Sequence, residues 1–245
     1  MYTSLARLYD RLMDDVDYAA WARFYVAIIE KYGKRPQSVF ECACGTGALT
    51  AELAKYGFKL AASDLSEEML EAAGERLRRS GARVPLIRQD MREMETPRKV
   101  EAIIACCDGA NYLTGDEDLS LFAQRAFASL RSGGVLAFDV SSREKLRAMG
   151  GQTYCDERDD IAAIWKNSYD GETNCLTMEV SLYAQEENGL YRRYEETHVQ
   201  RGRTEEEIRA ILEQAGFADI RVYGDRTFDV PGAMEQRLHF TAVKS

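Results

Sequence analysis

The chain has 245 residues, 45% of them hydrophobic and 30% charged, which is ordinary for a soluble globular protein of one large domain. Its formal net charge of −9 at pH 7 argues against a general binder of nucleic-acid phosphates. No apolar run approaches a transmembrane helix, and the first residues lack the apolar core of a signal peptide, so we expect a cytoplasmic protein without a membrane partner.

The cysteines and histidines do not form a metal-ligand pattern. No two of the six cysteines have the spacing Cys-x-x-Cys, and the two histidines, His198 and His239, are far apart in sequence. Reduced and mostly buried thiols are the better interpretation in a cytoplasmic protein. We therefore predict no metal site.

The N-terminal third begins with an amphipathic helix. Apolar residues at helical spacing predict a helix that starts at the capping residue Asp17 and stops at Gly33. The next stretch, residues 38–50, reads SVFECACGTGALT and predicts a strand, a glycine turn at residues 45–47 and a helix up to residue 56. Backbone N–H groups in such a turn and at the following helix start suit a nucleotide-like ligand.

Strand and helix patterns then alternate as far as residue 140. Further strands are predicted at residues 58–63, 84–88, 100–106 and 135–140, and helices at residues 66–80 and 116–130. Alternation of this kind predicts a Rossmann-like, doubly wound α/β fold with a mostly parallel sheet. The carboxyl ends of the strands, with Glu41, Asp64, Asp90 and Asp108, then share the edge at which such sheets bind ligands.

The pattern changes after about residue 150. Strand-like segments at residues 161–165, 176–184 and 190–199, separated by turns, predict an inserted antiparallel β cap. Thr204 and Glu207 form a capping box before a helix, and strands at residues 217–223 and 237–243 complete a seven-stranded sheet. We predict one domain of residues 1–150 and 204–245, with a cap of residues 151–203.

Taken together, these stretches resemble the class I S-adenosylmethionine-dependent methyltransferases over nearly the whole chain. Residues 41–47 resemble the family's first motif, an acidic residue before a glycine-rich turn, although Ala43 replaces a usual glycine. Asp64 stands where the ribose-binding acid ends the second strand, and Asp90 with Met91 where a pair contacts adenine. Residues 130–135, LRSGGV, resemble the turn before strand five, with serine in place of proline.

The resemblance extends to a bacterial subgroup of small-molecule methyltransferases that carry a small β-rich cap. The matching elements are a Tyr-Asp segment at residues 8–10, the sequence DGANYL at residues 108–113 and the end of the predicted cap. This resemblance implies S-adenosylmethionine as the cofactor and methyl transfer to an N or O atom of a small-molecule acceptor. The cofactor residues that it implies are Glu41, Ala43, Gly45, Thr46, Gly47, Asp64, Leu65, Met69, Asp90, Met91 and Cys107.

Aromatic and polar residues supply further candidates. Aromatic faces favour a cation, so Tyr18 and Trp21 could cover the cofactor, although the apolar helix face that holds Trp21 favours core packing. His198 could remove a proton from the acceptor, and Tyr9 is a second catalytic candidate. For the acceptor we expect Asp108, Asn111, Tyr112 and Arg201. Asn111 could instead hold its loop and Arg201 could pair with a surface acid, while His239 is expected to be structural.

Two other functions stay open at this point. An NAD-linked oxidoreductase also uses a glycine turn and an acid on the second strand, but Thr50 stands where its third glycine is expected. A non-catalytic cofactor-binding protein could retain the same fold, because a fold alone does not determine function. The sequence indicates neither the acceptor molecule nor the oligomeric state.

Overall fold

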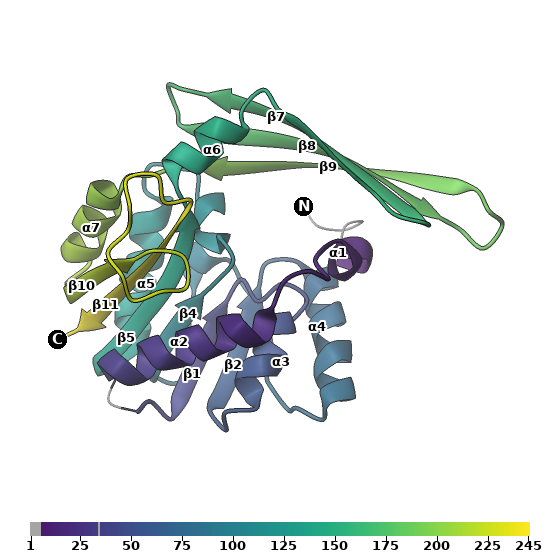
Figure 1. Ribbon diagram of the computed structural model, residues 1–245. Helices are drawn as coiled ribbons and strands as arrows, with labels where there is room; N and C mark the ends of the chain where they lie inside the picture. Colours follow the sequence, from purple (N-terminus) through teal and green to yellow (C-terminus); the bar gives the residue numbers. More distant parts are fainter. Residues whose placement is uncertain (1–5, 34) are drawn as a thin grey trace.

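The computed structural model describes residues 6–33 and 35–245, which form two separate sheets with most of the helices around the larger one (Figure 1). The larger sheet contains β1 (Ser38–Cys42), β2 (Lys59–Asp64), β3 (Leu86–Arg88), β4 (Val100–Ala105), β5 (Leu130–Ser141), β10 (Phe217–Tyr223) and β11 (Arg237–Lys244). The smaller sheet contains β6 (Thr153–Glu157), β7 (Ile161–Asp170), β8 (Cys175–Gln185) and β9 (Tyr191–Arg201). The helices are α1 (Ala6–Leu12), α2 (Tyr18–Gly33), α3 (Ala48–Ala54), α4 (Glu67–Ser80), α5 (Asp118–Ser129), α6 (Arg143–Met149) and α7 (Glu205–Gln214), with short 3-10 helices η1 (Met91–Glu93) and η2 (Gly109–Tyr112).

The larger sheet has the strand order β10-β11-β5-β4-β1-β2-β3. Strands β1 to β5 pair in parallel, and β11 pairs antiparallel with both β5 and β10. The strand order reverses beside β1, so the ends of β1 and β4 flank the position at which doubly wound sheets bind ligands. The predicted fold class is confirmed.

Alternate residues of the central strands face opposite helical layers. Phe40 and Ile103 pack with residues of α5 and α7, whereas Val39 and Ala102 pack with residues of α2 and α3. Successive side chains of a strand point to opposite faces, so a strand covered on both sides is apolar throughout. This explains the nearly continuous apolar sequence of β4, whose last four residues are all buried.

The predicted caps of α2 and α7 are present, and Ser66 caps α4. The Asp17 carboxylate accepts a hydrogen bond of 2.8 Å from the backbone N–H of Ala20, and Ser66 accepts one of 3.2 Å from Met69. Thr204 and Glu207 form both bonds of the capping box that starts α7. Each bond satisfies a backbone donor that the first helical turn leaves unpaired.

Three local features differ from the sequence prediction. The turn expected at residues 132–134 lies inside β5, because Leu130 already pairs with Val100 before the register shifts. Helix α6 was not predicted; it has only seven residues and one buried side chain, Leu146. The cap has four strands rather than three, because β6 is an edge strand without a buried residue and so lacks the apolar alternation of its neighbours.

The smaller sheet has the order β6-β7-β8-β9 and lies across the end of the larger sheet (Figure 1). Its inner face packs on α1, where Leu12 contacts a cluster that includes Ile161, Ala163 and Leu182. The Arg158 side chain adds a hydrogen bond of 3.4 Å to the carbonyl of Leu12. The division into a domain and a cap of residues 151–203 stays a prediction.

Within the described part of the chain, no helix combines the length and apolar character that spanning a membrane requires.

Candidate active site

A cavity of about 890 Å³ lies between the carboxyl ends of the parallel strands and the inner face of the smaller sheet. The strand ends supply its floor, and Met178, Val180 and His198 of β8 and β9 supply part of its roof. Most of the predicted site residues are brought together around it. They are Tyr18, Glu41, Ala43, Gly45, Thr46, Asp64, Leu65, Met69, Asp90, Met91, Cys107, Asp108, Tyr112 and His198.

The glycine turn after β1 is held by packing on one side and is open on the other. Gly47 has φ +73°, and a Cβ atom there would lie 2.9 Å from the Cβ of Ala73 in α4. Gly45 has φ +54°, and a Cβ atom there would have no neighbour within 4 Å. Both positions favour glycine because they need a left-handed backbone, but only Gly45 leaves its backbone accessible to a ligand. Gly47 supports the turn without lining the cavity.

Helix α1 is tied to this turn through Asp10. The Thr46 hydroxyl donates a hydrogen bond of 2.6 Å to the Asp10 carboxylate, which also forms an ion pair with Arg76 of α4. Arg76 additionally donates to the carbonyl of Thr46 at 3.0 Å. The side chain of Tyr9, in the same helix, lies outside what the structure describes, so its catalytic role stays a prediction.

Glu41 is a buried acid at the end of β1. Its exposed fraction is 2%, and its Oε2 atom has no hydrogen-bond partner among the described residues. Burial raises the pKa of Glu41 from an ordinary 4.5 to about 8, and the nearby carboxylate of Asp64 adds to that effect. A buried oxygen that lacks a donor fits the α-ammonium group of an amino-acid ligand such as the methionine part of S-adenosylmethionine.

Asp64 and Asp90 end neighbouring strands. The Asp64 carboxylate accepts backbone hydrogen bonds from Gly45 at 2.8 Å and Ser66 at 2.9 Å. Burial raises the pKa of Asp64, and these N–H groups partly offset the increase. Asp90 caps η1 by accepting from the backbone of Arg92 at 2.8 Å, and hydrogen bonds from the Arg92 side chain lower the pKa of Asp90. Both carboxylates therefore line the cavity as local anchors of the backbone.

Asp139, which the sequence did not identify, holds the turn that follows β4. Cys107 and Asp108 have φ values of +58° and +54°, unusual for residues other than glycine. The fully buried Asp139 accepts the N–H of Cys107 at 2.8 Å and that of Asp108 at 2.9 Å. Tyr25 and Arg237 also bind this carboxylate. The sequence feature that could have identified Asp139 is its position as an acidic residue within the apolar run of residues 135–140.

Asp108 lies at the cavity wall with both oxygens occupied. It accepts from Ser141 Oγ at 3.1 Å and Gln200 Nε2 at 3.2 Å, and its other oxygen faces Arg237 at 3.4 Å. Burial favours the neutral form, but Arg237, Lys145 and the two hydrogen bonds outweigh it and lower the pKa of Asp108. Asp108 is therefore an ionised, fully bonded carboxylate.

His198 lies on the inner face of β9 with an exposed fraction of 4%. Its Nδ1 atom is 3.4 Å from the Tyr112 hydroxyl, and its Nε2 atom is 3.5 Å from the carboxylate of Glu196. Burial lowers the pKa of His198 below its ordinary value of 6.5, so the imidazole is largely neutral at pH 7. A neutral imidazole beside a carboxylate can accept a proton.

Three other predicted residues do not line the cavity. Trp21 lies in the core, with its ring 5.6 Å from that of His239 and 5.2 Å from the Arg237 guanidinium. Asn111 donates to the carbonyls of Ser141 and Arg201, each at 3.0 Å, so it holds its loop. Arg201 binds the carbonyl of Thr114 at 2.9 Å and pairs with an acid, Asp116, at 2.6 Å. Core packing, a loop-holding role and pairing with an acid are the alternatives that the sequence left open for Trp21, Asn111 and Arg201.

Known proteins resemble this chain both in sequence and in structure. The family described as "Methyltransferase domain" matches residues 39–134. The chain is 34% identical over its full length to "Putative methyltransferase YqeM" of Bacillus subtilis, covering 98% of that protein. It is 26% identical to the dTDP-4-amino-2,3,4,6-tetradeoxy-D-glucose N,N-dimethyltransferase of Saccharopolyspora spinosa, covering 94% of this chain and 87% of the relative. A crystal structure of an S-adenosylmethionine-dependent methyltransferase from Clostridium acetobutylicum matches with a TM-score of 0.89 and 27% identity, covering 99% and 98% of the two chains.

Proposed function

Because this chain belongs to the class I S-adenosylmethionine-dependent methyltransferases, we propose that it methylates an N or O atom of a small-molecule acceptor, preferably an amine nitrogen. S-Adenosylmethionine is its cofactor, which resolves the choice between that sulfonium nucleoside and NAD. One observation carries the proposal: a single cavity is lined both by the strand ends that bear the cofactor motif and by the buried His198 of the smaller sheet.

The strand ends of β1, β2 and β3 form the cofactor half of this cavity. Glu41 and the turn at residues 45–47 would hold the amino-acid part, Asp64 the ribose, and Asp90 with Met91 the adenine. When bound, S-adenosylmethionine supplies an electrophilic methyl group. The chain's contribution is alignment and the exclusion of water, because displacement at a methyl group needs little covalent help from the protein.

The acceptor half lies between the ends of β4 and β5 and the inner face of the smaller sheet. An amine acceptor must lose a proton before its nitrogen can attack. The Tyr112 hydroxyl and His198 both line the cavity and lie within 3.4 Å of each other. Tyr112 can pass the acceptor's proton to His198 Nδ1, and Glu196 at Nε2 then stabilises the imidazolium.

The preference for nitrogen has support from a relative. The Saccharopolyspora spinosa protein is named as an N,N-dimethyltransferase of an amino sugar, and the resemblance covers most of both chains. A neutral histidine with a lowered pKa suits the deprotonation of an ammonium group better than that of an alcohol, whose pKa is far higher.

The replacement His198→Gln tests the acceptor half. We expect it to reduce methyl transfer to a responsive small amine by roughly 10² to 10⁴-fold, the usual contribution of a general base. Mass spectrometry of a panel of amines and alcohols measures the transfer, and titration with S-adenosylhomocysteine serves as the control, because cofactor affinity should not change. Wild-type rates in His198→Gln would contradict the proposed base.

The replacements Asp64→Ala and Asp90→Ala test the cofactor half. Each should weaken S-adenosylhomocysteine binding in calorimetry, while circular dichroism shows an intact fold. Asp90→Ala is the cleaner variant, because Asp64 also binds two backbone N–H groups of the turn. Unchanged affinity in both variants would contradict the assignment of this sheet edge.

A further inference from the structure

We propose that the acceptor carries an anionic group, a carboxylate or a phosphate, and that Lys145 binds it. This inference rests on the proposed function, because it concerns the acceptor half of the same cavity. Neither the cofactor motif nor the predicted acceptor residues include Lys145, whose helix the sequence did not predict.

Lys145 lines the part of the cavity that follows the end of β5. It belongs to the first turn of α6, directly after β5, and Lys145, Leu146 and Met149 of that helix line the cavity. Helix α6 packs against β7, β8 and β9, so it joins the two sheets. In the strand order, β4 and β5 lie on the other side of β1 from β2 and β3, which carry Asp64 and Asp90. Lys145 therefore lies in the acceptor half.

The ammonium group of Lys145 has donors to spare. Its Nζ atom donates to Ser141 Oγ at 3.1 Å, and the Ser141 hydroxyl donates in turn to Asp108 Oδ2 at 3.1 Å. No ion pair joins Lys145 to a carboxylate of residues 6–33 or 35–245. An ammonium group has three N–H donors, so a single hydroxyl partner leaves the others for a ligand.

The carboxylates nearest to Lys145 have other partners. Asp108 is bonded by Ser141, Gln200 and Arg237, as described above, and Asp139 by two backbone N–H groups, Tyr25 and Arg237. Asp225 pairs with Arg226 at 2.9 Å and with His239 at 3.4 Å. These acids offset part of the burial that lowers the pKa of Lys145, but they are not its hydrogen-bond acceptors.

The other cations of the cavity already have acidic partners. Arg88 pairs with Glu67 at 2.9 Å, and Arg92 pairs with Asp90 at 2.6 Å. The described lysine and arginine side chains that line the cavity are Arg88, Arg92 and Lys145. Lys145 is the one of these three that forms no ion pair with a carboxylate of the described residues. A half-buried cation of this kind gains most from an anion, because the pair is shielded from water.

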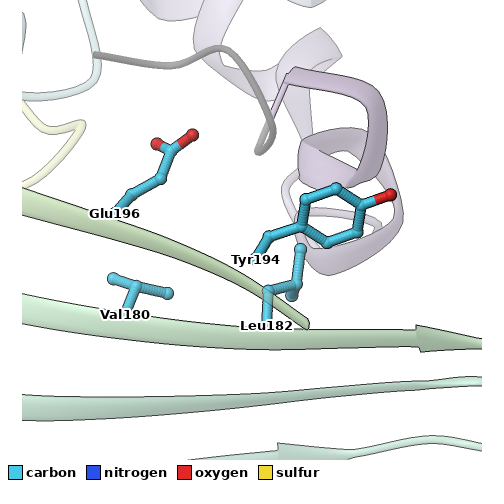
Figure 2. Close-up of a pocket in the computed structure, with 4 residues that line it drawn as sticks. All are labelled: Val180, Leu182, Tyr194 and Glu196. Atoms are coloured by element: carbon cyan, nitrogen blue, oxygen red, sulfur yellow. The ribbon is translucent and has the colours of Figure 1, made fainter. Parts of the chain in front are cut away.

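The opposite wall favours one orientation of such an acceptor. Figure 2 shows Val180 on β8 beside Leu182, Tyr194 and Glu196; of these four residues Val180 lines the cavity, as does Met178 of the same strand. The apolar side chains of Met178 and Val180 on that wall offer an anion no hydrogen bond, whereas Tyr112 and His198 present polar atoms that an amine can use. The nitrogen of the acceptor therefore faces Tyr112 and His198, and its anionic group faces Lys145.

Calorimetry with matched amine probes tests this inference. Wild-type protein and the variants Lys145→Met, Lys145→Arg and Lys166→Met are each saturated with S-adenosylhomocysteine. They are then titrated with glycine and glycinamide, and with glucosamine 6-phosphate and glucosamine. Lys166 is an exposed lysine of β7, so its replacement controls for the loss of one positive charge.

We expect the wild type to bind at least one anionic probe tenfold or more tightly than its neutral partner. Lys145→Met should lose this preference, whereas Lys145→Arg and Lys166→Met should keep it. The pair that responds identifies a carboxylate or a phosphate. Equal or absent binding of both members of each pair, or a preference that survives in Lys145→Met, overturns the inference.

Binding of S-adenosylhomocysteine separates this inference from the proposed function. If every variant binds it as the wild type does, a negative result with the probes concerns the anion alone. If the wild type does not bind it, the proposed function fails and the inference fails with it. A Lys145→Met variant that melts early is replaced by Lys145→Gln, with the same expected loss.

Discussion

Replacing Glu41 by glutamine should abolish a proton release that accompanies cofactor binding. With a pKa of about 8, Glu41 is neutral in roughly nine of ten ligand-free molecules at pH 7. An ammonium group bound beside it would favour the carboxylate, so binding should release about 0.9 proton at pH 7. Ionising Glu41 then costs roughly tenfold in affinity at pH 7 relative to higher pH.

Calorimetry in buffers of different ionisation enthalpy measures this release directly. Titration with S-adenosylhomocysteine from pH 6 to pH 8 should show the affinity rising nearly tenfold per pH unit and levelling off near pH 8. Glu41→Gln should bind more weakly, release no proton and lose the pH dependence. A wild-type release near zero at pH 7 would refute the reasoning.

The same carboxyl group links stability to pH. Its pKa is raised in the folded chain, which therefore keeps a proton that the unfolded chain loses near pH 4.5. The ligand-free protein should lose stability as the pH rises from 4.5 to about 8, by at most about 5 kcal/mol. Urea denaturation should therefore show Glu41→Gln to be more stable than the wild type at pH 8, although it binds the cofactor less tightly.

Three further predictions concern other parts of the structure. Gly47→Ala should lower the free energy of unfolding by about 2 kcal/mol, because its Cβ would meet Ala73, whereas Gly57→Ala should cost only about 1 kcal/mol. Equal losses in thermal melts would contradict the packing argument. The imidazole of His198 should titrate below pH 6.5 in proton NMR, where the chain has only one other histidine; a midpoint above 6.5 would exclude its burial as the dominant effect. Asp139→Asn should destabilise the protein by about 2 to 3 kcal/mol in urea, because an amide cannot accept from two backbone N–H groups with both of its end atoms.

The parts of the fold that follow from local pattern were predictable. The apolar run of β4, the glycine stop after α4 and the capping box of α7 are each determined by residues close in sequence. The strand ends with Glu41, Asp64 and Asp90 were predictable for a related reason, since parallel strands direct their carboxyl ends to one edge.

The rest depends on contacts between segments that are distant in sequence. Asp139 matters because it meets the backbone of residues 107 and 108, and Lys145 because its neighbouring acids bind other partners. Strand β6 is paired on one side only, so its residues carry little of the alternation by which a strand is recognised. Trp21 also could not be assigned from the sequence alone, because an aromatic ring that lies near a site in the sequence pattern can pack in the core instead.

Asn111 has a consequence for how such a protein can diversify. Its side chain accepts the N–H of Ser141 at 2.8 Å and donates to the carbonyls of Ser141 and Arg201. The chain leaves the larger sheet at Ser141, and β9 ends at Arg201, so one amide joins the two ends of the intervening segment. A segment whose ends are fastened together can change length and sequence at little cost in loop-closure entropy. Mutation can therefore alter the roof of the cavity while the strand ends of the larger sheet keep their geometry. On the proposed function, new acceptor specificities would then arise by changes confined to that segment.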